Sequence, residues 1–275
     1  MTDVADAAFG HRPDLVITRT PTDPRERWLA AVVLGGQGRY AAAATVLDGL
    51  RGHPDPVLAA LACATLASHR RQLGGHATAR VLDAEGHARL AGLADTPGIA
   101  EARSDVLLGL AADAVGAARL GEARRLVATA RSRGAGWRAA VRTDWVSAEI
   151  ELSAARAEEA VPYAERAAVR AGQEGSVRHR IKSSMVLGAA LAARGTTGRA
   201  ERIVRQALAD ATDLGLLSLV WPGALIMAEL DATRADEFCR CAGLVLQSVL
   251  RRTDPIGRRL AERSPWVPRL AGPTG

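Results

Sequence analysis

The chain has 275 residues, of which 48% are hydrophobic and only 3% are aromatic, and its formal net charge is +6 at pH 7. This apolar content is enough for a sizeable core, which excludes a globally disordered chain. Small side chains must supply most of the packing, and this favours helices packed on helices over a β-sandwich or barrel.

Residues 1–24 show no helical periodicity, and we expect them to form an extended or disordered N-terminal arm. The segment HRPDLVITRT contains a short apolar run that could belong to a strand, but it is too short to change the fold class. The opening MTDVADAAFG carries early acidic residues and no apolar stretch of the signal-peptide type. We therefore expect no secretion signal.

Residues 25–252 carry the pattern of helical hairpins, which is clearest around residue 200. Ala200, Val204 and Ala207 form one helical stripe with the spacing i, i+4, i+7. Leu187 and Gly188 lie on the preceding helix, and a glycine between the two segments ends that helix. The pattern predicts two antiparallel helices with small side chains where they touch.

The same figure recurs along the chain, each time with an alanine near the start of the second helix. The successive spacings of these anchors are 36, 44, 37, 40 and 35 residues, and the anchors are Ala43, Ala79, Ala123, Ala160, Ala200 and Ala235. One hairpin cannot bury its own apolar face, so neighbouring hairpins must stack.

These features resemble the tetratricopeptide repeat (TPR) family, most closely in the Leu187–Ala207 copy and next in Gly38, Tyr40, Ala43 and Leu47. The resemblance implies an all-α fold, a right-handed superhelical stack of about six antiparallel helix pairs (a TPR-like α-solenoid). It also implies a concave surface lined by the first helix of each pair. An ordinary irregular helical bundle is the alternative, because alanine is abundant throughout the chain.

Residues 253–275 form a Pro-rich cap and tail, in which we predict one short helix from about Pro255 to Arg263. The longest uncharged stretch, residues 214–228, is too short to span a bilayer, so we expect no membrane contact. The three cysteines make no disulfide framework, which favours a reducing cytoplasm. Lys182 is the only lysine, and the Arg, Ala and Gly usage suggests a GC-rich bacterial genome.

No motif in the chain carries recognisable chemistry. The segment LGGQGRY lacks the Lys-Ser/Thr of a phosphate-binding loop, and the six histidines have no metal-ligand spacing. We therefore expect no enzymatic activity, no metal and no cofactor.

We expect a protein- or peptide-binding adaptor or regulatory scaffold. On the first helices the inward positions recur at i, i+3, i+7, and cations beside an aromatic ring suit an acidic, partly apolar peptide. The candidate binding residues are Trp28, Arg71, Arg142, Trp145, Glu149, Lys182, Met185 and Trp221. The competing interpretation of Trp145 is a core residue between hairpins. The alternative function is a ligand-sensing or nucleic-acid-associated regulator that binds through its Arg-rich edges.

Overall fold

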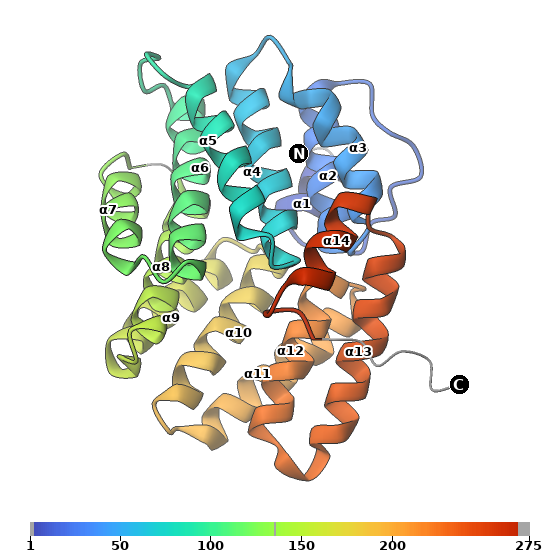
Figure 1. Ribbon diagram of the computed structural model, residues 1–275, viewed down its shortest axis with the longest axis vertical. Coiled ribbons are helices and arrows are strands. Elements are labelled where there is room, and N and C mark those ends of the chain that lie inside the picture. The colour runs from blue at the N-terminus through green and yellow to red at the C-terminus, as the bar shows by residue number, and fades with distance from the viewer. Residues whose placement is uncertain (1–2, 135, 269–275) are drawn as a thin grey trace.

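The computed structural model describes residues 3–134 and 136–268, and all of the regular structure in these residues is helical (Figure 1). The predicted all-α class is thus confirmed. In chain order the helices are α1 (Asp3–Phe9), α2 (Pro24–Gly36), α3 (Tyr40–Arg51), α4 (Pro56–Gln72), α5 (His76–Arg89), α6 (Pro97–Gly116), α7 (Leu120–Arg131), α8 (Trp137–Ser153), α9 (Ala157–Gln173), α10 (Val177–Ala193), α11 (Thr197–Asp213), α12 (Leu217–Leu230), the 3₁₀ helix η1 (Ala232–Arg234), α13 (Ala235–Arg251) and α14 (Pro255–Arg263).

Four helices begin with the same local signal, a capping side chain followed by proline. The Asp55 carboxylate accepts a hydrogen bond from the amide of Val57, and proline follows it in the first turn of α4. The starts of α2, α6 and α14 use Asp23, Thr96 and Asp254 in the same way. The caps satisfy amides that have no intrahelical partner, and proline loses nothing at this position.

Five tight turns join a first helix to a second helix, and each contains one residue with a positive φ angle. These residues are Gly38, Gly74, Ala118, Ala155 and Gly195. In each case the alanine five positions later is fully buried, and these alanines are Ala43, Ala79, Ala123, Ala160 and Ala200. Five of the six predicted anchors therefore occupy one equivalent place, near the start of α3, α5, α7, α9 and α11.

The sixth anchor is wrong. Ala235 is the first residue of α13 and is only half-buried. The short helix η1 is inserted before α13 and displaces the pattern. Phe238 occupies the fourth position of α13 and is buried there.

Gly188 lies where α10 packs against α11, as the repeat pattern predicts. A methyl group at this position would collide with Cγ2 of Val204, which projects from α11. The small residue is therefore needed for the close approach of the two helices.

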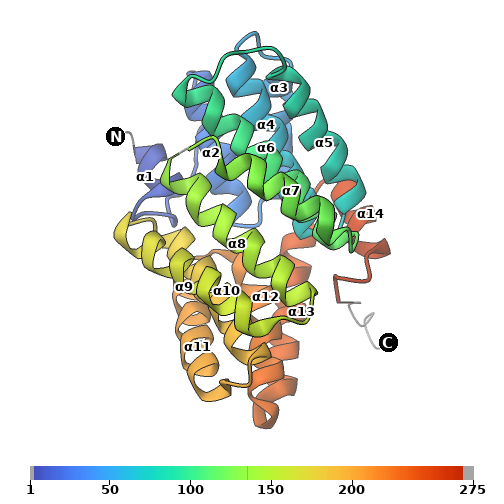
Figure 2. The ribbon, with the colours of Figure 1, turned by 90° about the vertical axis from the view of Figure 1, so that its left-hand side faces the viewer.

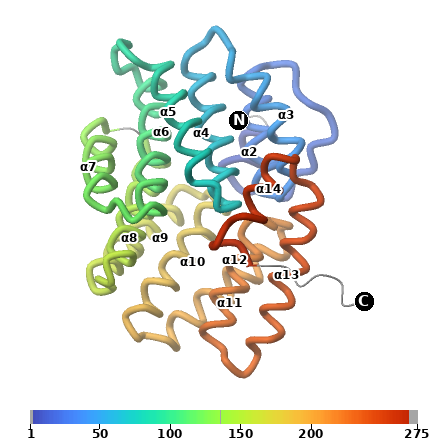
Figure 3. Tube along the Cα trace, viewed as in Figure 1, coloured from blue at the N-terminus to red at the C-terminus, as the bar shows by residue number. Residues whose placement is uncertain are grey.

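The first helices contact one another in a closed cycle, α2 to α4, α6, α8, α10, α12 and back to α2. The second helices α3, α5, α7, α9, α11 and α13 each pack on the first helix before them. The Ser218 hydroxyl on α12 donates a 2.9 Å hydrogen bond to the carbonyl of Gly36 on α2. The end of the chain thus returns to its beginning (Figure 3).

Helix α14 strengthens this closure and forms where the sequence predicts a short helix. Figure 1 shows it beside α4, and Arg70 Nη1 lies 2.6 Å from Asp254 Oδ2. Arg70 is almost fully buried, so this ion pair is shielded from solvent. Residues 269–275 of the expected tail lie outside the described residues. No helix in the described part of the chain is long and apolar enough to cross a lipid bilayer.

The expectation of a non-helical N-terminal arm is wrong for Asp3–Phe9, which forms α1. Ala7 and Ala8 are buried, and the carbonyl of Gly10 accepts a 3.0 Å hydrogen bond from the Val177 amide. An apolar helix face that packs on α2 and α10 therefore outweighs weak local periodicity. The arm that follows is not helical, and the side-chain amide of Gln37 donates hydrogen bonds to the carbonyl groups of Pro13 and Leu15 in this arm. Figure 2 shows α1 and α14 on opposite sides of the molecule.

Candidate ligand-binding cavity

The cycle of first helices surrounds a cavity of about 620 Å³. All six first helices contribute to its wall, and so do Phe9 at the end of α1 and Trp266 after α14. Much of the wall is aliphatic, and these side chains are Val32, Leu108, Val115, Val146, Leu152 and Leu219. The cavity can therefore hold the apolar body of a ligand.

An aromatic cluster forms one part of the wall. The ring of His179 stacks on Trp145 with 5.4 Å between centroids, and Phe9 lies 5.7 Å from Trp28. The indole nitrogen of Trp28 donates a 2.9 Å hydrogen bond to the Thr65 hydroxyl. Because both Trp residues are buried, these contacts fix the shape of the wall.

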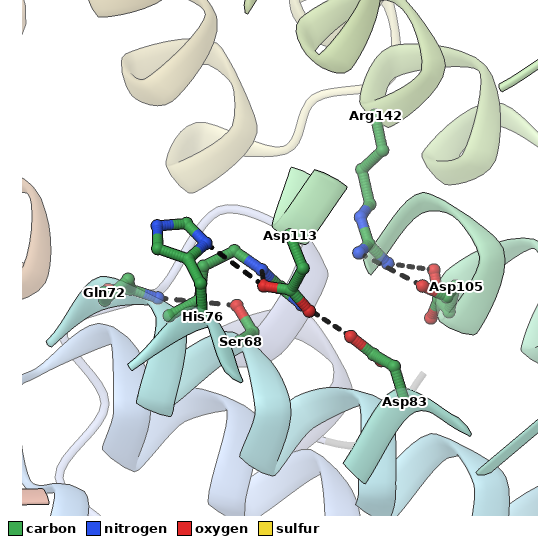
Figure 4. A network of polar contacts seen from close by, with 8 residues as sticks. Ser68, Gln72, His76, Asp83, Asp105, Asp113 and Arg142 are labelled. Atoms are coloured by element: carbon green, nitrogen blue, oxygen red, sulfur yellow. Dashed lines mark hydrogen bonds and ion pairs between the residues drawn. The ribbon is translucent and has the colours of Figure 1, made fainter. Parts of the chain in front are cut away.

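Two wall arginines share one buried carboxylate. Arg138 Nη2 lies 2.7 Å from Asp105, and Arg142 pairs with the same side chain (Figure 4). Burial alone would raise the pKa of Asp105, but the two guanidinium groups lower it below its ordinary value. Arg138 also lies 4.2 Å above the ring of Phe9 and so connects α1 with α6 and α8. Arg138 also pairs with Glu101, so the two arginines face two carboxylates and this part of the wall is close to charge balance.

A second buried network holds Arg71. Figure 4 shows Asp113 between His76 and Asp83, with the two carboxyl groups facing each other. Arg71 Nη2 lies 2.5 Å from Asp83 Oδ2, and Arg71 Nε lies 2.8 Å from Asp113 Oδ1. Burial raises the pKa of Asp83 to about 8, the nearby Asp113 adds to this, and Arg71 opposes it. Arg71 is therefore held firmly in place at the cavity by partners on α5 and α6.

Arg178 and Lys182 line the cavity on α10 and differ from these arginines because neither side chain makes a hydrogen bond or ion pair within the described residues. Burial, together with the charges of Arg138 and Arg142, lowers the pKa of Arg178 to about 10. Burial also lowers the pKa of Lys182, whose Nζ lies 4.4 Å from the ring centre of Trp145. An anion placed here would relieve both cations.

Six of the eight predicted binding residues line this one cavity: Trp28, Arg71, Arg142, Trp145, Glu149 and Lys182. The structure does not bring the other two there. Met185 is buried between helices and packs close to Gly223 of α12. Trp221 is buried in a cluster with Tyr40 and Leu246, because Pro222, the next residue, takes the inward position.

Sequence reasoning missed several wall residues, among them Arg138, Arg178 and His179. The signal was present, because Arg138 and Arg178 lie four residues before the predicted Arg142 and Lys182. Residues four apart share one helix face. Phe9 could not be found this way, since it reaches the cavity from a separate helix.

No protein-family model matches the chain, and no curated protein matches it either. Within residues 3–134 and 136–268, no group of three or more His, Cys, Asp or Glu side chains is placed to hold a metal ion. The chemistry of the cavity therefore has to be argued from its own residues.

Proposed function

We propose that this chain is a non-enzymatic binding protein that senses a compact, acidic and partly apolar ligand in the central cavity. The observation that carries the proposal is the pair of unpartnered cations, Arg178 and Lys182, in a wall that also contains many aliphatic and aromatic side chains. Pockets for small molecules commonly measure about 300–1,000 Å³ and combine apolar walls with a few polar groups. The 620 Å³ cavity falls in this range.

Arg178 and Lys182 are half-buried, and the partial desolvation of two cations without a counter-ion costs free energy, which is a feature of binding sites. A carboxylate or phosphate between them would restore the missing charge balance. The aliphatic side chains opposite would then cover the rest of the ligand. This division of roles supports an organic anion over an inorganic one.

We further propose that the helix pairs are TPR-like repeats in a right-handed superhelix, of which the cavity is the concave face. The recurring positive-φ turn, followed five residues later by a buried alanine, supports a common repeat unit. We place the protein in the cytoplasm of a bacterium. The free thiols of Cys63, Cys239 and Cys241 support a reducing compartment.

A peptide-binding adaptor is the second candidate. Trp266 lines the cavity and is still 65% exposed, so the wall is open to solvent at this side chain. The end of an acidic peptide could enter there. The closed cycle of helices favours a compact ligand, since an extended peptide needs an open groove.

Nucleic acid is a weaker candidate because carboxylates already neutralise many exposed arginines. Arg133 pairs with Asp95, and Arg180 pairs with Asp210 at 2.9 Å. Each pair reduces the positive charge that a phosphate backbone would meet.

Calorimetric titration with octanoate, 3-phenylpropionate, inorganic phosphate and a short acidic peptide tests the proposal. Arg178→Gln should weaken binding of the best probe at least tenfold. Arg180→Gln is the matched control, because Arg180 is exposed two residues away on the same helix. Equal losses in both variants, or no binding by any probe, would contradict the proposal. Preference for the peptide over both carboxylates would favour the adaptor.

A further inference from the structure

Lys182 is the only lysine among the 36 lysine and arginine residues of the chain. It lies in the wall of the cavity, on the inward face of α10. Every other basic position uses arginine, including the neighbouring Arg142 and Arg178. Among the lysine and arginine side chains that line the cavity, Lys182 is thus the one that can readily lose its proton.

Arginine and lysine differ in what they can do once desolvated. A guanidinium stays charged, whereas a buried amine can become neutral and then acts as a nucleophile. Amines are activated in this way by an apolar pocket or by adjacent cations. Lys182 has both, because burial lowers the pKa of its amine and the charges of Arg142 and Arg178 add to this, whereas the charge of Glu149 opposes it.

The surroundings of Lys182 also supply the other groups that an amine reaction needs. Its Nζ lies 4.4 Å from the ring centre of Trp145, which limits the directions in which the amine can point. Arg142 and Arg178 line the same cavity and can hold an anionic group. Glu149 lines it too and makes no ion pair within the described residues.

We propose that Lys182 captures its ligand covalently as an imine, and that the ligand is an aldehyde or ketone carrying a carboxylate or phosphate group. This inference rests on the proposed function, since it places the same acidic ligand in the same cavity. It adds a reactive carbonyl to the ligand's chemistry. Arg178 holds the anionic group while the carbonyl carbon faces Nζ.

The reaction needs no oxidant, reductant or further reactant. The nitrogen lone pair of the neutral amine attacks the carbonyl carbon, and the carbonyl π electrons move to its oxygen. Glu149 carries one proton from this nitrogen to the alkoxide oxygen, which gives a carbinolamine, and then carries the second proton from the nitrogen to the hydroxyl group. Water leaves, the C=N bond forms, and one ligand plus one amine give one imine plus one water. Hydrolysis reverses the step and releases the ligand.

Reductive trapping tests the inference directly. The full chain is incubated with phenylpyruvate, pyruvate or pyridoxal 5′-phosphate and cyanoborohydride, and peptides are mapped by mass spectrometry. We expect one reduced adduct, on the peptide containing Lys182, at least tenfold above the level at the chain's α-amino group. Phenyllactate is the matched probe without a carbonyl and should give no adduct.

Lys182→Arg removes the amine and should abolish the adduct, whereas Arg180→Gln, at an exposed position on the same helix and outside the cavity, should leave the adduct yield unchanged. Glu149→Gln should slow adduct formation severalfold. Absence of a Lys182 adduct with all three carbonyl probes, or labelling confined to the α-amino group, would overturn the inference. If carboxylates still bind in that case, the proposed function stands without the covalent step.

Discussion

The indole nitrogen of Trp145 donates a 2.8 Å hydrogen bond to the hydroxyl of Ser183, and this bond joins α8 to α10. Both side chains are buried, and Trp145 also lines the cavity. Trp145 is therefore a core residue and a cavity residue at once. The two interpretations that the sequence left open are compatible.

Replacing Trp145 should affect stability and binding together. For Trp145→Ala we expect a loss of about 3–5 kcal/mol in unfolding free energy, the usual cost of removing a buried Trp. Trp145→Phe keeps a ring but leaves Ser183 without its donor, which costs about 1–2 kcal/mol. Urea denaturation measures both changes. If the alanine variant stays folded, it should bind the acidic ligand more weakly by about 2 kcal/mol or more.

Arg178 should favour ligand binding at the expense of the stability of the ligand-free protein. Removing its charge relieves the repulsion from Arg138 and Arg142 and ends the desolvation of an unpaired cation. We expect Arg178→Met to raise the melting temperature of the ligand-free protein while it abolishes anion binding. Thermal denaturation without and with 3-phenylpropionate measures both effects. A lower melting temperature would show that Arg178 stabilises the wall instead.

Replacing Ala155 with glycine should stabilise the protein. The φ angle of Ala155 is +58°, in the left-handed region where a side chain costs about 1–2 kcal/mol. We expect Ala155→Gly to raise the unfolding free energy by about 1 kcal/mol in urea denaturation. Gly195→Ala is the reciprocal control, since Gly195 occupies the equivalent turn and a methyl group there would meet no atom within 4 Å. Gly195→Ala should lower the unfolding free energy by a similar amount.

The unfolding free energy should decrease at acidic pH because His69 is buried. Burial lowers the pKa of His69 from 6.5 to about 3, with the Arg70 charge adding to this. Between these values the unfolded chain binds a proton that the folded chain does not, so unfolding free energy decreases as pH falls below 6.5. The slope is at most about 1.4 kcal/mol per pH unit for this group. Denaturation from pH 7 to pH 4 should show a shallower dependence of unfolding free energy on pH for His69→Leu than for the native protein.

The helical class, five of the six hairpin anchors and six of the cavity residues could be predicted because they depend on spacing along single helices. The inward direction of the Arg142 side chain can be predicted because Arg142 lies three residues before Trp145 on one helix face, and this does not depend on the neighbouring helices. The anchor alanines follow from the need for small residues at close contacts. Ala118 and Ala155 were hidden because alanine rarely adopts a positive φ angle, so no glycine marked their turns.

The remaining features depend on contacts between distant parts of the chain. Asp254 caps a local helix in any fold, but its pairing with Arg70 exists only because the last helix meets the second pair. The displacement of Trp221 from the wall likewise depends on Tyr40 and on α13. Spacing within one helix contains no information on such long-range partners.

Because α12 and α14 complete the packing of α2 and α4, the first helices cannot reach their final state until the last ones have left the ribosome. The growing chain therefore exposes the apolar inner faces of its early hairpins throughout synthesis. An open helical array would fold progressively from its first repeat, whereas this one must wait. We expect the joining of α2 with α12 and of α4 with α14 to be the last step of folding, and their separation to be the first step of unfolding.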